Sequence, residues 1–120
     1  MNEDQRLKVS QLLITMITAD GVIKPEEREF MEKAIARWKL PMPEAPLSQR
    51  SFGTVTEVLR SLEPEAQAGV LALLVEAAVA DGELDPREHA LLLAAGATLG
   101  IDATVLEERI KKRLACVRAV

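Results

Sequence analysis

The chain has 120 residues and a formal net charge of −4, and its aromatic residues are one tryptophan and two phenylalanines. This length is enough for one domain with a real core but short for two. The negative charge argues against nucleic acid as a partner, because nucleic-acid binding normally needs a basic face. A core with so few aromatic side chains must pack aliphatic residues and alanine, which favours helices. We therefore predict a single domain over residues 1–120.

Cys116 is the single cysteine, which excludes an intramolecular disulfide and a cysteine-based metal cluster. The first residues lack the basic and then apolar pattern of a secretion signal. The longest apolar stretch, residues 68–80, is shorter than the ~18 residues of a membrane span and contains Glu76. We expect a cytoplasmic protein without a transmembrane segment.

Hydrophobic periodicity predicts a first helix from about Glu3 to Thr18 and a second from Pro25 to Trp38. Pro25 suits the first helical position because its fixed φ is already helical. Apolar residues line one face of each helix: Val9, Leu12, Leu13, Met16 and Ile17 in the first, and Phe30, Met31, Ala34, Ile35 and Trp38 in the second. Three prolines between Pro41 and Pro46 then exclude a helix, and residues 41–53 form the predicted linker.

The second half of the chain predicts four more helices. A short one covers about residues 55–62, and a longer one from about residue 64 to 80 is apolar on nearly every side, as expected at the centre of a bundle. The next helix has Asp85, Pro86 and Glu88 at its N-cap, N1 and N3 positions and ends near Gly100. The last covers about residues 103–118, with Asp102 as its cap and a buried stripe at Leu106, Ile110, Leu114 and Val117.

The sequence also contains an internal repeat. The segment TADGVIKPEEREF, Thr18 to Phe30, returns 61 positions later as VADGELDPREHAL, Val79 to Leu91. We predict two tandem helix-turn-helix repeats, about residues 9–40 and 70–101, that pack on each other with pseudo-two-fold symmetry and bring their turns close together. Since no period-2 strand pattern occurs, the predicted fold class is an all-α compact helical bundle.

These two Ala-Asp-Gly turns, each followed by a hydrophobic residue, a proline and a glutamate, resemble the tellurite-resistance TerB family and the related N-terminal domain of the DjlA co-chaperones. The resemblance extends from about Val9 to Ile101. It implies a compact helical domain, a metal site at the acidic turns, and association with stress-response systems, often near the inner membrane face. The sequence has no DnaJ-type His-Pro-Asp motif, which argues against co-chaperone activity in this chain.

The turns can also be compared with the calcium loop of EF-hands. Setting each glycine at loop position 6 places Asp20 at position 5 and Glu27 at position 12, and it places Asp81 and Glu88 in the same way. Positions 1 and 3 lack carboxylates in both copies, so each loop supplies half a site. We predict that these four carboxylates together bind a divalent cation such as calcium, magnesium or manganese, because close carboxylates repel unless a cation or protons intervene.

Helix capping is the competing interpretation of the same residues. Glycine suits the end of a helix, proline suits N1, and glutamate at N3 favours the positive helix end. Capping accounts for each residue but not for the carboxylate that precedes glycine in both copies. On this interpretation the chain is a pure protein-interaction or scaffold module. With one histidine, one cysteine and no tyrosine, we do not expect an enzyme.

Three further features of the sequence lead to predictions. Glu76 lies in an apolar helix and must face solvent, find a donor or join a metal site; we expect it at a solvent-facing helix edge. Cys116 is expected to pack the terminal helix. The basic residues of that helix are expected to solvate its outer face, although peripheral contact with anionic lipid or an acidic partner is an alternative; they are Arg109, Lys111, Lys112, Arg113 and Arg118. We expect a protein partner.

Overall fold

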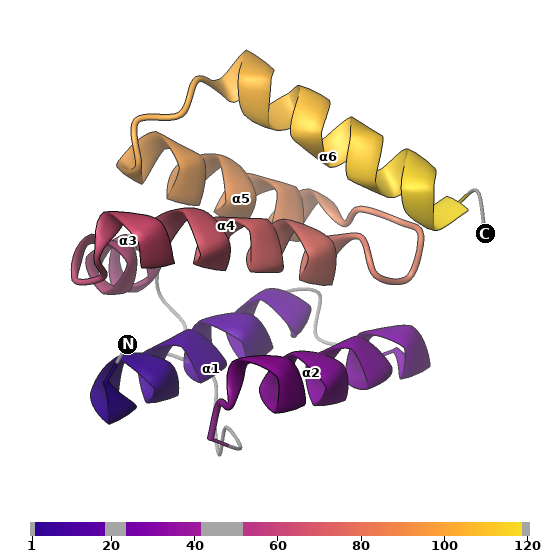
Figure 1. Cartoon of the computed structure of the whole chain (residues 1–120). Coiled ribbons are helices and arrows are strands. Elements are labelled where there is room, and N and C mark those ends of the chain that lie inside the picture. The colour runs from indigo at the N-terminus through magenta and orange to yellow at the C-terminus, as the bar shows by residue number, and fades with distance from the viewer. Residues whose placement is uncertain (1, 19–23, 42–51, 119–120) are drawn as a thin grey trace.

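The computed structural model describes residues 2–18, 24–41 and 52–118, which form six α-helices and no strand (Figure 1). The helices are α1 (Glu3–Ile17), α2 (Pro25–Trp38), α3 (Phe52–Arg60), α4 (Pro64–Ala78), α5 (Pro86–Thr98) and α6 (Ala103–Arg118). The Cα radius of gyration is 13.1 Å, close to the ~13 Å of a compact domain of about 100 residues. The predicted all-α bundle is confirmed.

Local capping sets most of the helix ends. Asn2 and Gln5 form a capping box at α1, and a proline stands at the first position of α2, α4 and α5. The carboxylate of Asp102 accepts from the backbone of Thr104 at 2.8 Å, as expected of a cap for α6. Two predicted ends were wrong by a few residues: α3 begins at Phe52 and α4 ends at residue 78. Apolar stripes locate the middle of a helix better than its caps.

The central position predicted for α4 is confirmed. In Figure 1, α4 crosses the middle of the molecule, with α1 and α2 below it and α6 above it. Its neighbours include α1, α2, α5 and α6. Buried α4 residues therefore point in several directions: Val70, Leu71, Leu73, Leu74, Val75, Ala77 and Ala78. The five predicted core residues of α1 are also buried.

The stripes of α2 and α6 are covered over only part of their length. Met31 and Ala34 of α2 are buried, whereas Phe30, Ile35 and Trp38 are half-buried. In α6, Leu106 and Ile110 are buried, but Leu114 and Val117 are half-buried. The two helices flank the end of α4 without closing over it, and their apolar residues there stay partly accessible.

The helix bounds agree with the predicted duplication. Helix α1 runs from Glu3 to Ile17 and α4 from Pro64 to Ala78, so both ends are displaced by 61 positions. Helices α2 and α5 begin at Pro25 and Pro86, with the same displacement. The pseudo-two-fold relation between the repeats stays a prediction.

Candidate functional site

The second acidic turn, between α4 and α5, is held by hydrogen bonds that involve its own backbone, Asp81 and α6. Gly82 has φ +82°, the left-handed conformation that the sequence led us to expect, and its N–H donates to the carbonyl of Val79 at 2.9 Å. Asp81 Oδ1 accepts from the backbone N–H of Glu83 at 3.0 Å. Arg118 Nε donates to the Gly82 carbonyl at 2.8 Å, so the end of α6 holds this turn in place.

The described part of the first acidic turn begins at Lys24, and Asp20 and Gly21 lie outside the described residues. The backbone N–H of Lys24 donates to Glu27 Oε1 at 3.1 Å. The glutamate at N3 thus reaches back to the start of α2, as in a capping box. Glu27 is only 2% exposed.

A lysine joins the two turns. Lys24 Nζ lies 2.6 Å from Asp81 Oδ2 and 3.3 Å from Glu83 Oε2. The Asp81 side chain is 9% exposed, so this ion pair is partly shielded from water. The hydrogen bonds to Asp81 and Glu83 raise the pKa of Lys24 above its usual range. Lys24, at the start of α2, therefore lies beside the second turn.

The carboxylates at N3 are buried in both repeats. Glu88 is 3% exposed, against 2% for Glu27, although each stands at the beginning of a charged helix. Asp85 caps α5 as predicted, because its Oδ1 accepts from the backbone N–H of Arg87 at 2.8 Å. A hollow of about 240 Å³ opens beside this cap and is lined by Lys24, Asp81, Glu83, Leu84, Asp85, Pro86 and Glu88.

The geometry brings some of the four predicted ligands into one region. Asp81 and Glu88 line the same hollow, and Glu27 is tied to Lys24, which reaches Asp81. Within residues 2–18, 24–41 and 52–118, no three His, Cys, Asp or Glu side chains form a group that would hold a metal ion. Since Asp20 lies outside these ranges, the four-carboxylate site stays a prediction.

Sequence reasoning missed Lys24 and Glu83 as members of this site. A signal was present, because Lys24 stands 61 positions before Asp85 and so carries the opposite charge at the equivalent position. His89, the residue after Glu88, pairs with Glu107 and links α5 to α6.

Two other expectations were wrong. Glu76 is 24% exposed and is held by Arg113, with Nη2 to Oε1 at 2.6 Å, while Arg37 lies 3.9 Å away. Its hydrogen-bond donor lies on α6, and a longer ionic contact comes from α2, because both helices flank this face of α4. Cys116 is exposed, because α6 turns it toward the gap beside α4 and not toward the core.

Comparisons with known proteins place the chain in a family. A family model described as "Tellurite resistance protein TerB" matches residues 47–110, which include the second acidic turn. The comparisons with curated proteins and with solved structures gave no match. Among the residues that the structure describes, no helix is long and apolar enough to cross a membrane. Because the family match covers more than half of the chain, the protein belongs to the TerB family.

Proposed function

We propose that this TerB domain is a non-enzymatic cytoplasmic binding module whose paired acidic turns take up a divalent cation through Asp20, Glu27, Asp81 and Glu88. The observation that carries the proposal is the contact between Lys24 and Asp81, since it brings the start of α2 beside the second acidic turn. Carboxylate oxygens are the ligands that calcium, magnesium and manganese prefer. The family description, tellurite resistance, supports a place in a stress-response assembly with a protein partner.

Electrostatics supports a cation at this edge. The hollow beside the second turn is lined by four carboxylates and one ammonium group. Carboxylates that lie close together repel, and a divalent cation lowers that repulsion for several of them at once. Because each turn offers few oxygens and water completes the shell, we expect a dissociation constant on the order of millimolar.

Lys24 competes with the cation in this proposal. Its ammonium group already neutralises part of the charge of Asp81 and Glu83, at 2.6 and 3.3 Å. An ion that coordinates Asp81 must displace this group from the carboxylate. Removing the lysine charge therefore strengthens cation binding, whereas removing the charge of Asp81 abolishes it.

Thermal unfolding in calcium, magnesium or manganese tests the proposal. A ligand bound only to the folded state at ten times its dissociation constant adds about 1.4 kcal/mol to the unfolding free energy. Adding the cation should raise the melting temperature of the native protein and raise that of Lys24→Met by a larger amount. It should leave the melting temperature of the double variant Asp20→Asn with Asp81→Asn unchanged. Lys33→Met is the matched control, because Lys33 also lies on α2 but pairs with Glu29.

The second candidate is a scaffold module without metal, favoured by the contacts that the turns already make. Asp85 caps α5, Glu27 bonds to the start of α2, and Lys24 pairs with Asp81. Each of these stabilises a turn without a bound ion. A flat titration in the native protein and in Lys24→Met would favour this function over cation binding.

A further inference from the structure

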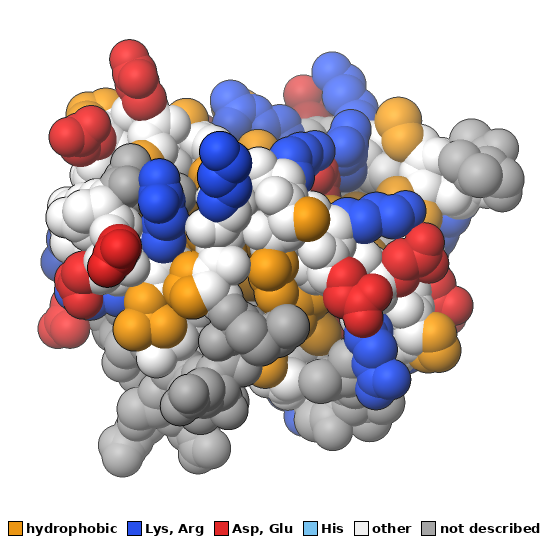
Figure 2. Space-filling view, turned by 60° about the horizontal axis from the view of Figure 1, so that its bottom comes forward, with side chains coloured by type: hydrophobic (Ala, Val, Ile, Leu, Met, Phe, Trp, Pro, Cys, Tyr) orange, Lys and Arg blue, Asp and Glu red, His pale blue; other side chains and the backbone are white. Residues whose placement is uncertain are grey.

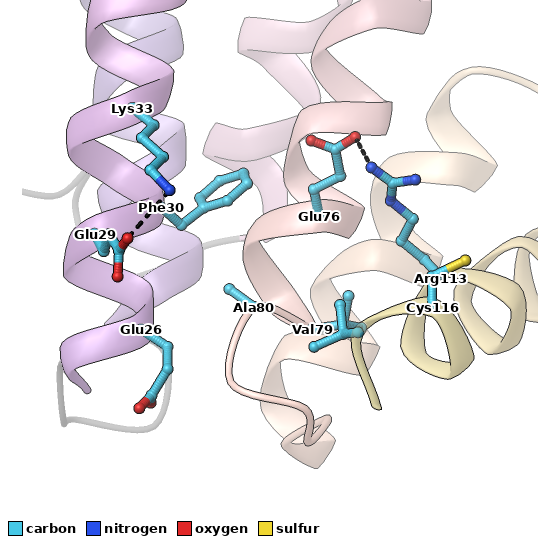
Figure 3. Close-up of a pocket in the computed structure, with 10 residues that line it drawn as sticks. Glu26, Glu29, Phe30, Lys33, Glu76, Val79, Ala80, Arg113 and Cys116 are labelled. Carbon is cyan, nitrogen blue, oxygen red and sulfur yellow. Dashed lines mark hydrogen bonds and ion pairs between the residues drawn. The ribbon is translucent and has the colours of Figure 1, made fainter. Parts of the chain in front are cut away.

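A crevice of about 450 Å³ opens between α2 and α6, over the end of α4 (Figure 3). Its apolar surface comes from three helices: Phe30 of α2 points into the gap, Val79 and Ala80 follow the end of α4, and Val117 belongs to α6. The crevice is distinct from the hollow at the acidic turns, with which it shares no lining residue.

The crevice continues along α4. A second hollow of about 220 Å³ is lined by α4 and α6, with Leu71, Val75 and Leu106 among its apolar residues. Glu76 and Arg113 line both hollows, and their side chains form the 2.6 Å ion pair drawn in Figure 3. The two hollows are therefore compartments of one crevice, which this ion pair crosses in the middle.

The length of the crevice fits a helix. The α4 residues that line the two compartments extend from Ala68 to Glu76, which at 1.5 Å per residue is about 12 Å, or roughly two helical turns, and Val79 and Ala80 line the crevice beyond the helix end. Ala68 and Ala72 of α4 are small residues four positions apart, so they leave room for a backbone to approach. An elongated apolar crevice of this kind is the receptor surface of helix-in-groove recognition.

The walls of the crevice carry opposite charges. Glu26, Glu29 and Lys33 line it from α2 and leave that wall with a net negative charge, while Arg109 and Arg113 line it from α6. Glu29 is paired with Lys33, but both side chains are mostly exposed, so this pair contributes little. Figure 2, which views the molecule from the α1 and α2 side, shows exposed apolar side chains at the centre of one face with charged side chains of both signs around them.

We propose that the crevice along α4 receives an amphipathic α-helix of a partner protein, with its apolar stripe on the floor, basic residues toward α2 and acidic residues toward α6. The charge pattern selects this occupant, because the two walls complement a helix with opposite charges on its two flanks. A second copy of the chain fits less well, since two concave surfaces placed face to face leave the apolar floor uncovered.

The test uses the full-length chain and a synthetic 14-residue helical peptide as the probe. The peptide carries leucines at positions 3, 7, 10 and 14, lysines along one flank and glutamates along the other. Fluorescence anisotropy measures its binding, and maleimide labelling of Cys116 reports occupancy, because this single exposed cysteine lines the crevice. We expect binding that slows the labelling of Cys116, and neither effect from a scrambled peptide of the same composition.

Two pairs of variants locate the peptide. Cys116→Trp fills the crevice and should abolish binding, whereas Ala115→Trp, at an exposed neighbouring position that does not line the crevice, should not. Glu26→Lys should weaken binding about fivefold, since one rim ion pair is lost and replaced by repulsion. Glu32→Lys makes the same charge change at an exposed α2 position outside the crevice and should have no effect.

Several results would overturn the proposal. One is the absence of peptide binding together with unchanged labelling of Cys116, and another is full binding to Cys116→Trp. Equal effects of Glu26→Lys and Glu32→Lys would also contradict it, and these two variants remain informative if a tryptophan variant fails to fold. Labelling that slows as the protein concentration rises, without peptide, would show that a second copy covers the crevice instead.

Discussion

The two helix-turn-helix units of this TerB domain have the same frame but differ at one charged position. Each second helix begins at a proline and buries a glutamate at N3, Glu27 in one case and Glu88 in the other. The residue before the proline is Asp85 in the second unit, where it caps its own helix. In the first unit it is Lys24, whose ammonium group reaches across to Asp81. The same local signals thus begin both second helices, and the position that differs links the start of α2 to the second turn.

The units also differ in what covers them. The buried residues of α1 lie on one face, whereas those of α4 point in several directions, toward α1, α2, α5 and α6. Helix α2 ends at Trp38, and its C-cap Lys39 has φ +56°. Helix α5 ends at Thr98, and a short connection through Gly100, with φ +76°, leads to α6. The crevice lies on the α4 side, between α2 and α6.

The largest losses of stability are expected for substitutions at equivalent core positions of the two units. Leu13 and Leu74 stand 61 positions apart and are 0% and 1% exposed. Leu13→Ala and Leu74→Ala should each lower the unfolding free energy by about 2–5 kcal/mol, since each leaves a cavity in a packed core. Urea denaturation measures the loss, and Leu7→Ala, at a 40% exposed position, is the control. If the unfolding free energy fell by less than about 1 kcal/mol at either position, the two leucines would not be equivalent core residues.

The next effect concerns the left-handed turn. Gly82→Ala should cost about 1 kcal/mol, because alanine is strained at φ +82°. The cost is conformational, since an added Cβ would meet only Arg118 Cγ, at 4.0 Å. The repeat predicts a similar loss for Gly21→Ala. Thermal denaturation measures the melting temperature of both variants. An unchanged melting temperature for Gly21→Ala would show that the first turn has a different conformation.

The sequence predicted the helices and most of the buried stripes, because both depend on contacts between residues three or four positions apart. The glycine conformation of the second turn and the cap at Asp85 are local in the same sense. The ion pair of Lys24 with Asp81 joins residues 57 positions apart. The offset of the repeat predicted that the turns would meet, but it did not indicate which side chains would make the contact.

The errors at Glu76 and Cys116 have a different physical origin. Helical periodicity identifies the stripe of α6 that faces the bundle, but it does not tell how far along the helix the neighbouring helices cover that stripe. The structure leaves the end of α6 and the middle of α4 beside a crevice. There Glu76 is bonded to Arg113, while Cys116 is exposed. The sequence did not indicate which parts of α4 and α6 a distant helix would cover.

A smaller effect is expected at the cap that only the second unit has. Asp85→Ala removes the acceptor for the backbone N–H of Arg87 and should cost about 1 kcal/mol of unfolding free energy. Asp85→Asn, which keeps a side-chain oxygen, should cost much less. Urea denaturation of the two variants compares them. Equal losses would show that the charge of Asp85, and not its capping bond, stabilises the turn.

The smallest effect concerns Lys24, whose side chain is 37% exposed. The hydrogen bonds to Asp81 and Glu83 raise its pKa above the usual range, so the folded protein holds the lysine proton more tightly than the unfolded chain does. The stabilisation is complete below the unfolded pKa of about 10.4 and is lost as the pH rises through the folded value. Lys24→Met should therefore be less stable than the native protein near neutral pH.

The pH dependence of this difference separates the ion pair from simple loss of side-chain packing. The difference in unfolding free energy between native protein and Lys24→Met, measured in urea, should stay constant from about pH 7 to 9 and shrink above about pH 10. Lys33→Met controls for removal of a lysine from α2, since Lys33 pairs with Glu29 away from the turns. A difference that persists unchanged at high pH would mean that the hydrocarbon stem of Lys24, and not its charge, joins the two repeats.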